Sequence, residues 1–488
     1  MRLCIIVKVT GDLLRRFGLM FLWPMAVAAY YSEWTDLGGF ALAGVLASAA
    51  GQTMWLAHPE REPDLRRIEA LAVVAGTWLV VALLGSVPYV WVGLSPVDAV
   101  FESMSGFTTT GATIFTDFGA FGRGVLFWRS LTQWIGGMGV IALFVAVLPR
   151  LAMGAGRLFF AEAPGPTDEK LTPHVRKTAA VLWRLYAGLT LAEFLALWFA
   201  GMPVYDALCH AMTTLAAGGF SPNALSIAGY DNAAVEWIIC VFMFLAGASF
   251  ALQYRALLGR PGVFLRDEEF RMYTAIVLVA ALFVTGFLWR AGGELTVAFR
   301  QGLFQTLSIL TTTGYASVDF QLWGDQTRMI LLVLMFIGGC AGSAAGGPKV
   351  IRHLLIGRFT LTELRRTLHP RGVLPVKISG KVVSEDVMRT VLVFFLFYVL
   401  TFALCAIAVI LLGADLVTGV TATMATLGNV GPGLGLVGPM ANYGHLHPLS
   451  KLVLTGAMWI GRLEVLTVLA LLRPEVWRSA HWRAAARG

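Results

Sequence analysis

Long apolar stretches recur along the whole chain, and they constrain its fold more than any other feature of the sequence. A helix needs about 20 apolar residues to cross a hydrocarbon core of about 30 Å. Ten stretches approach or exceed that length: 17–31, 38–56, 70–92, 124–148, 179–201, 234–257, 273–288, 329–355, 391–412 and 452–472. Only 14% of the 488 residues are charged, whereas a soluble domain carries about 25%. We therefore expect an all-α integral membrane protein.

The net charge of +8 is explained by topology. With ten spans and a cytoplasmic N-terminus, most of the 37 Lys and Arg fall on one side, as the positive-inside rule requires. The opposite loops are left with Arg123, Arg129, Arg290, Arg300, Arg328 and Lys451. The pattern predicts a multi-pass protein of the bacterial cytoplasmic membrane with both termini cytoplasmic. It gives no reason to expect a nucleic-acid partner.

Four segments on the non-cytoplasmic side share one pattern. Each begins with an amphipathic stretch, reaches a glycine in a small or polar cluster, and returns to an apolar span. The segments are PVDAVFESMSGFTTTGATIF, PVYDALCHAMTTLAAGGFSPN, TVAFRQGLFQTLSILTTTGYAS and DLVTGVTATMATLGNVGPGLG. The stretch before each glycine has about 12 residues, enough for a helix that crosses only half a membrane. We expect four tandem span–pore-helix–span repeats around a central pore.

These repeats define the predicted organisation of the chain. Residues 1–67 form an extra N-terminal pair of spans, and repeat 1 covers 68–150. Repeats 2, 3 and 4 cover 151–260, 261–360 and 361–488. Aligning the clusters matches Gly111, Gly219, Gly314 and Gly431, but the adjacent Gly218 leaves the second alignment open by one residue.

Irregular backbone at membrane depth requires protein or water to satisfy its polar groups. Four such segments meeting at one axis could line a pore with peptide carbonyls, which replace the water shell of a cation such as K+. Glycine suits these positions because it adopts backbone angles closed to other residues. The candidate filter residues are Thr109, Thr110, Gly111, Ala217, Gly218, Gly219, Thr312, Thr313, Gly314, Asn429, Val430 and Gly431. The alternative for a single cluster of this kind is helix packing through small residues.

The stretch MFIGGCAGSAAGGPKVIRHLL interrupts the third repeat where its second span should cross. Each glycine lowers helix stability by about 1 kcal/mol and a proline by about 3 kcal/mol. We expect a loop that crosses the pore and acts as a gate, the alternative being a packing face of small residues. The candidate gate residues are Gly342, Ser343, Ala344, Gly346, Gly347 and Lys349.

Two charged residues lie within or beside these segments. Arg462 falls near the middle of the last span, where a charge is costly and usually faces a cavity or a partner. We expect it to face the pore, the alternative being an ion pair with Glu464 or Glu193. Glu102 precedes the first cluster and is either an attractor of cations at the mouth or a solvated loop charge.

The four clusters, together with GGCAGSAAGGPKVIR and GRLEVLTVL, resemble the TrkH family, the membrane subunits of bacterial Trk potassium uptake systems in the TrkH/KtrB/HKT superfamily. The resemblance covers nearly the whole chain. It implies that Gly111, Gly219, Gly314 and Gly431 belong to a potassium filter. It further implies that the glycine-rich segment is the gate and that Arg462 is the pore arginine.

The resemblance also implies a homodimer with separate pores and a cytoplasmic, nucleotide-binding regulatory subunit of the TrkA type. No organic cofactor is expected in this chain. The basic stretch 358–381 is a candidate docking surface, or it fixes topology and contacts anionic membrane lipids. The family's gate usually carries Thr at the position of Ala344 and an aliphatic residue at that of Pro348, so gating is expected to transfer less well than ion preference.

Two other functions remain open from the sequence. Potassium uptake coupled to Na+ or H+ would need intramembrane relay groups, and few carboxylates occupy such positions. A membrane-embedded lipid-modifying enzyme would need a clustered nucleophile or acid–base pair, and none is found. We therefore expect a transporter and not an enzyme.

Overall fold

The computed structural model describes residues 1–57, 67–151, 172–369 and 374–478. Within these ranges the regular structure is helical except for a short antiparallel hairpin of β1 (Lys377–Ile378) and β2 (Lys381–Val382). The expected all-α class is thereby confirmed. Residues 152–171, where the predicted second repeat begins, lie outside the described residues.

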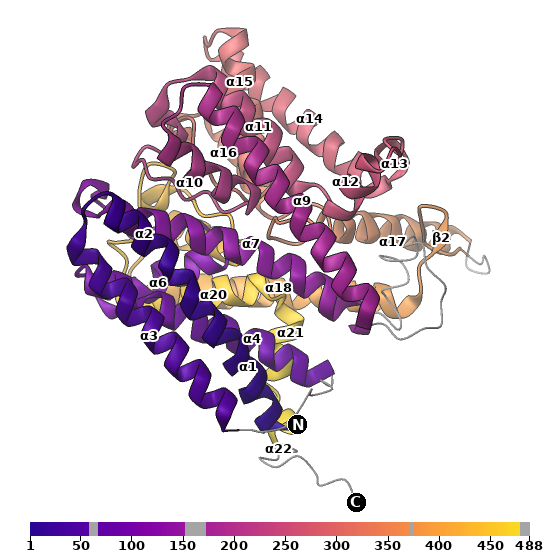
Figure 1. Cartoon of the computed structure of the whole chain (residues 1–488). Helices are drawn as coiled ribbons and strands as arrows, with labels where there is room; N and C mark the ends of the chain where they lie inside the picture. The colour runs from indigo at the N-terminus through magenta and orange to yellow at the C-terminus, as the bar shows by residue number, and fades with distance from the viewer. Residues whose placement is uncertain (58–66, 152–171, 370–373, 479–488) are drawn as a thin grey trace, which may run out of the picture.

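The N-terminal unit is a helical hairpin, drawn in indigo at the lower left of Figure 1. One arm consists of α1 (Leu3–Phe17), η1 (Gly18–Phe21) and α2 (Leu22–Tyr30), and the other is α3 (Trp34–Leu56). Glycines allow the arms to touch: a Cβ added to Gly51 would lie 2.8 Å from the carbonyl oxygen of Gly11. Such close backbone approach is the usual means of helix association in membranes.

Each of the four repeats contains a first span, a half-length helix, an irregular segment and a second span. The first spans are α4 (Arg67–Gly85) with α5 (Val87–Trp91), α9 (Thr172–Phe199), α14 (Glu268–Arg290) and α18 (Glu385–Leu411). The half-length helices are α6 (Pro96–Phe107), α10 (Val204–Leu215), α15 (Leu295–Leu310) and α19 (Leu416–Leu427). Three of these have the 12 residues that the sequence pattern predicts, and α15 is longer, with 16.

The second spans differ from one repeat to the next. They are α7 (Arg123–Leu151), α11 (Ala233–Gly247) with α12 (Phe250–Leu257), α16 (Asp325–Met335) with α17 (Val350–Leu368), and α20 (Pro448–Arg462) with α21 (Val465–Leu471). A short 3-10 turn precedes each of them: η2 (Phe118–Ala120), η3 (Ser226–Tyr230), η4 (Phe320–Leu322) and η5 (Gly435–Val437). The short helices α13 (Val263–Arg266) and α22 (Pro474–Arg478) complete the described elements.

Three of the four second spans are broken, and the sequence predicts only the break in repeat 3, between α16 and α17. The chain bends by 104° between α11 and α12 and by 108° between α20 and α21. The expectation of continuous spans over 234–257 and 452–472 is therefore wrong. At the second bend Glu464 has a φ of +68°, a left-handed conformation that ends the helix after Arg462.

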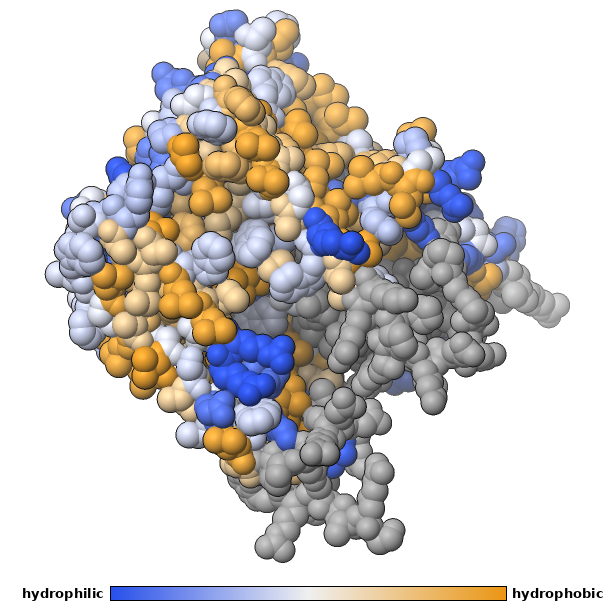
Figure 2. Space-filling view, in the orientation of Figure 1, coloured by the Kyte–Doolittle hydropathy of each residue, from blue (hydrophilic) through white to orange (hydrophobic). Residues whose placement is uncertain are grey.

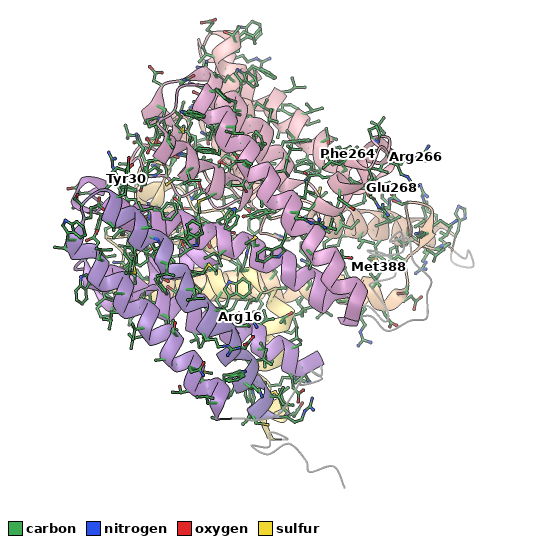
Figure 3. The ribbon with its side chains drawn as sticks, in the orientation of Figure 1. Arg16, Tyr30, Phe264, Arg266, Glu268 and Met388 are labelled. Carbon is green, nitrogen blue, oxygen red and sulfur yellow. The ribbon has the colours of Figure 1, made fainter. Side chains whose placement is uncertain are left out.

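Helices of membrane-spanning length and composition are found throughout the described residues. Five qualify by themselves, and up to seven if each bent pair counts as one span. Apolar side chains cover much of the visible face in Figure 2, as lipid contact requires. Figure 3 places Tyr30, at the end of α2, on the opposite edge from Arg266, Glu268 and Met388. The two edges correspond to the two ends of the spans.

Two of the basic residues expected in outer loops are buried inside second spans. Arg129 is inside α7 and Lys451 is inside α20, and their exposed fractions are 1% and 4%. Lys451 Nζ lies 2.6 Å from Asp98 Oδ1 on α6. Both residues therefore join elements within the protein, because a buried charge needs a partner.

Candidate functional site

The four half-length helices end in the same way. In each, the residue two positions before the aligned glycine adopts a left-handed conformation, and the next N–H bonds five residues back along the helix. These residues are Thr109, Ala217, Thr312 and Asn429, with φ of 52°, 54°, 58° and 54°. The bonds run from Thr110 to Ser105 (2.9 Å), Gly218 to Thr213 (2.9 Å), Thr313 to Ser308 (2.9 Å) and Val430 to Ala425 (2.7 Å). This is a Schellman ending, which reverses the chain directly after each helix.

The aligned glycines themselves also have positive φ, and each abuts the backbone of the next repeat. Their φ values are 79° at Gly111, 75° at Gly219, 78° at Gly314 and 101° at Gly431. A Cβ added to Gly111 would lie 2.2 Å from the Gly218 oxygen, and one added to Gly219 would lie 1.9 Å from the Thr313 oxygen. A Cβ added to Gly314 would lie 2.0 Å from the Val430 oxygen, and one added to Gly431 would lie 2.7 Å from the Thr110 oxygen. The contacts pass from repeat 1 through 2, 3 and 4 and back to 1. The four segments therefore form a closed ring in which glycine is required at each step.

This geometry resolves the alignment of the second repeat. Ala217 shares its backbone conformation with Thr109, and Gly219 shares that of Gly111. Gly219, and not Gly218, is therefore the counterpart of the other three glycines. Gly218 corresponds to Thr110, whose carbonyl faces the glycine of a neighbouring repeat.

Polar side chains support the ring from outside. Gln133 on α7 donates to the Gly218 oxygen (2.6 Å) and accepts from the Phe220 N–H (3.0 Å). The Tyr443 hydroxyl donates to the Gly431 oxygen (2.7 Å). The sequence reasoning missed both residues, because each occurs in one repeat only and lacks a counterpart that would mark it.

Glu102 is neither a solvated charge nor an attractor at the mouth. Its side chain is fully buried on α6, and its carboxylate lies 2.7 Å from the Arg129 Nε. Both expectations for Glu102 are wrong, because they considered only its neighbours in sequence. The sequence did indicate a partner for Glu102, because Arg129 is the single arginine within the apolar stretch 124–148 that follows it.

The loop 336–349 between α16 and α17 confirms the expected break and meets the other two breaks. It lies against the bend of repeat 2, where Cys340 donates to the Gly247 oxygen (2.8 Å) and Ala344 to the Ala246 oxygen (3.1 Å). Phe250, at the start of α12, donates back to the Gly342 oxygen (3.1 Å). The loop's unpaired backbone groups thus find partners at a second irregular segment, as membrane burial requires.

The loop also touches the ring. The Gly346 N–H donates to the Thr312 hydroxyl (2.7 Å), and a Cβ on Gly346 would lie 2.7 Å from the Gly428 oxygen. Gly342 and Gly347 have φ of 72° and 69°, so both positions favour glycine. The loop is therefore packed directly beneath two of the four ring segments.

The remaining candidate gate residues are held by contacts within the loop and with its neighbours. The Ser343 hydroxyl donates to the Cys340 oxygen (2.6 Å), and Lys349 Nζ donates to the Ala345 oxygen (2.7 Å). The Ala344 methyl belongs to a buried cluster with Leu215 and Phe250. Pro348 is buried as well.

Arg462 is the last residue of α20, beside the break between α20 and α21. Its Nη1 donates to the Ala344 oxygen (2.9 Å), while Nε and Nη2 have no hydrogen-bond partner among the described residues. Glu464 pairs instead with Arg352 at the start of α17, at 2.6 Å. The alternative of an ion pair with Glu464 or Glu193 is therefore wrong, because among the described residues no carboxylate pairs with Arg462. Because the contact uses the Ala344 carbonyl, it does not depend on the side chain at position 344.

Known proteins share this architecture over their whole length. A family profile described as the TrkH cation transport protein matches residues 38–479. The Trk system potassium uptake protein TrkH of Salmonella typhimurium is 37% identical over 481 residues, covering 97% of this chain and 99% of the relative. That of Halomonas elongata is 38% identical over 488 residues, covering 98% and 100%. The crystal structure of the potassium transporter TrkH from Vibrio parahaemolyticus is similar with a TM-score of 0.90 and 35% identity, covering 98% and 100%. The chain belongs to the TrkH family of cation transport proteins.

Proposed function

We propose that the protein takes up potassium across the bacterial cytoplasmic membrane, through the ring centred on Gly111, Gly219, Gly314 and Gly431. The observation that carries this proposal is the closed order of contacts, in which each glycine abuts the carbonyl before the glycine of the next repeat. Four repeats that close on one another in this way surround an axis. The relatives are named as potassium uptake proteins, which supports K+ as the transported ion.

The chemistry of the ring suits a cation. The half-length helices end at the ring, and the C-terminal end of a helix carries a partial negative charge. Peptide oxygens at fixed spacing can replace the hydration shell of K+ without a charged side chain. The filter therefore comprises the glycines and the two residues before each of them: Thr109, Thr110, Ala217, Gly218, Thr312, Thr313, Asn429 and Val430. The alternative of a lipid-modifying enzyme is excluded by membership of a transporter family.

The loop 336–349 is the proposed gate, and Arg462 is the proposed barrier beside it. Two contacts support these roles: Gly346 with the Thr312 hydroxyl, and Arg462 with the Ala344 carbonyl. Both are single hydrogen bonds, worth about 1 kcal/mol net for the neutral pair and about 2 kcal/mol for the bond from the charged guanidinium. A loop held by such bonds can be displaced by binding energy from a partner.

Regulation and assembly complete the proposal. The chain forms a homodimer with one pore in each copy, and a cytoplasmic nucleotide-binding subunit of the TrkA type acts on the gate. The relatives are named as members of a Trk system, which supports a partner. Exposed Arg365 and Arg366, near the end of α17, provide a basic surface for docking. Flux that responds to nucleotide only when the second chain is present would support this arrangement.

The test is rubidium uptake into proteoliposomes, with Na+ as competitor. Wild-type protein is expected to prefer Rb+ over Na+, and Gly314→Ser is expected to weaken that preference because its Cβ meets the Val430 oxygen at 2.0 Å. Gly286→Ser is the matched control, since Gly286 lies in α14 of the same repeat and a Cβ there meets nothing within 4 Å.

Unchanged selectivity in Gly314→Ser, with folded protein and an unaffected control, would contradict the assignment of the ring. The same liposomes separate a channel from a symporter. Uptake that requires an imposed Na+ or H+ gradient, and not only a potassium gradient, would favour coupled transport.

A further inference from the structure

Arg129 is a buried charge that the proposed mechanism does not use. It lies in α7, its side chain is 1% exposed, and each of its three nitrogens donates a hydrogen bond to a residue near the ring. Nε donates to Glu102 Oε1 (2.7 Å), Nη1 to the Ser221 oxygen (3.1 Å) and Nη2 to the Thr113 hydroxyl (3.1 Å). A planar guanidinium holds such partners in a fixed geometry that a lysine could not reproduce.

These bonds join two neighbouring repeats just beyond their ring glycines. Thr113 follows Gly111 by two residues in repeat 1, and Ser221 follows Gly219 by two residues in repeat 2. Glu102 closes the arrangement from α6, because its carboxylate accepts from the Thr113 hydroxyl (3.0 Å) and from the Ile114 N–H (2.9 Å). One ion pair therefore fixes the irregular segment after Gly111 to its own half-length helix, α6, and to the irregular segment after Gly219 in repeat 2.

Aromatic rings seal this ion pair from water. The Arg129 guanidinium carbon lies 4.0 Å from the ring centroid of Phe220, 4.7 Å from that of Phe115 and 5.1 Å from that of Phe118. Phe220 is the residue directly after Gly219. A charge pair in a dry, low-dielectric site interacts strongly and holds its geometry.

The other repeats have no ion pair at these positions, and repeats 2 and 3 keep a neutral side-chain anchor there. At the position of Glu102 they carry His210, Gln305 and Ala422, and at that of Arg129, the seventh residue of the second span, they carry the buried residues Ile239, Leu331 and Leu454. His210 contacts the Ser221 hydroxyl (3.0 Å) and Gln305 the Ser317 hydroxyl (3.3 Å), each in its own repeat. The fold can therefore be built with neutral residues here. Replacing a buried ion pair by such residues is often neutral for stability, so stability alone does not account for the charges.

We propose that Glu102 and Arg129 are positioning residues that determine ion selectivity. They do so by holding the irregular segments after Gly111 and Gly219, in repeats 1 and 2, at a fixed separation. The inference rests on the proposed potassium filter. Where the size of the ring contributes to selectivity beside the field strength of its carbonyls, a ring that discriminates K+ from the smaller Na+ must resist contraction around Na+. The pair opposes contraction at the interface of repeats 1 and 2.

The test converts the pair into its repeat 3 counterpart. The double variant Glu102→Gln with Arg129→Leu reproduces Gln305 and Leu331, and it leaves no unpaired buried charge. We expect it to fold with a wild-type thermal midpoint, to conduct Rb+, and to lose selectivity for Rb+ over Na+ on the order of tenfold. The single variant Arg129→Leu leaves Glu102 unpaired and is expected to reduce the yield of folded protein.

Two further variants distinguish positioning from a merely structural role. Arg129→Lys keeps the charge beside Glu102 but cannot reach Thr113 and Ser221 together, so its selectivity is expected to fall between wild type and the double variant. Arg328→Leu is the control. Arg328 lies in α16 of repeat 3, pairs with Asp325 of the same helix, and has a side chain that is one-third exposed. It is expected to change nothing.

The outcomes separate this inference from the proposal on which it depends. If wild-type protein does not prefer Rb+, the filter assignment itself fails. If wild-type protein is selective and the folded double variant is equally selective, Glu102 and Arg129 are structural and the inference is overturned.

Discussion

Repeats 1 and 3 carry the same four letters, TTTG, and build the same local structure from them. Thr108 and Thr110 share a hydroxyl hydrogen bond of 2.8 Å, and Thr311 and Thr313 share one of the same length. The residues two positions before the glycines have nearly equal φ, 52° at Thr109 and 58° at Thr312. Where the chain must form the ring, the two repeats are interchangeable.

Beyond the ring the two repeats differ. The second span of repeat 1 is the single helix α7, and it carries the charged anchor Arg129. The second span of repeat 3 breaks into a loop rich in glycine, and that loop bonds to the ring through Thr312. The comparison teaches that ring geometry requires four alike segments, whereas the contacts around the ring differ from repeat to repeat. Repeat 1 has the buried ion pair beside the ring, and repeat 3 has the loop that we propose as the gate.

The largest expected effect comes from shortening the loop of repeat 3 within residues 342–347. Removing these residues eliminates the bonds from Gly346 to Thr312 and from Arg462 to Ala344. At about 1 kcal/mol for the first bond and about 2 kcal/mol for the second, whose donor is charged, their loss is expected to raise basal Rb+ flux on the order of a hundredfold. Flux into proteoliposomes without any partner chain is the measurement. Monodisperse protein with no increase in flux would show that the loop is not a gate.

A smaller effect is expected from one hydroxyl, and repeat 1 provides its control. Thr312→Val removes the acceptor of the Gly346 N–H while keeping the shape of the side chain. Basal flux is expected to rise roughly fivefold, which corresponds to about 1 kcal/mol. Thr109→Val is the matched variant, because the Thr109 hydroxyl has no hydrogen-bond partner within the described parts of the chain. Equal flux from both variants would contradict a specific link between ring and loop.

The ring could be predicted from sequence because it is repeated. Four glycine clusters at the same place in four units identify one another, even where Gly218 and Gly219 leave the register open. The break in repeat 3 could also be predicted, since five glycines and a proline accumulate between residues 336 and 349. In both cases the local backbone conformation dictates the residue type.

The supports could not be predicted, because they occur once and act over long distances in sequence. Gln133 reaches Gly218, and Tyr443 reaches Gly431, through contacts that no repeat duplicates. The bend at Glu464 has neither glycine nor proline between Arg462 and Val465, so nothing in the local sequence marks it. Glu102 was misread for a related reason: its partner Arg129 lies in the next helix and only the fold brings them together.

The smallest expected effect tests how far the likeness of the two TTTG segments extends. Thr110 has a second bond that Thr313 lacks, because its hydroxyl accepts from Asn429 Nδ2 (2.9 Å) of repeat 4. Thr110→Val and Thr313→Val both remove a hydroxyl pair, but only the former leaves an amide hydrogen of Asn429 without its acceptor. We therefore expect Thr110→Val to be the less stable by about 1 kcal/mol, seen as a lower thermal midpoint in detergent. If Thr313→Val were equally or more destabilised, the closure between repeats 4 and 1 would not depend on this bond, and the backbone contact of Gly431 with Thr110 would have to maintain it alone.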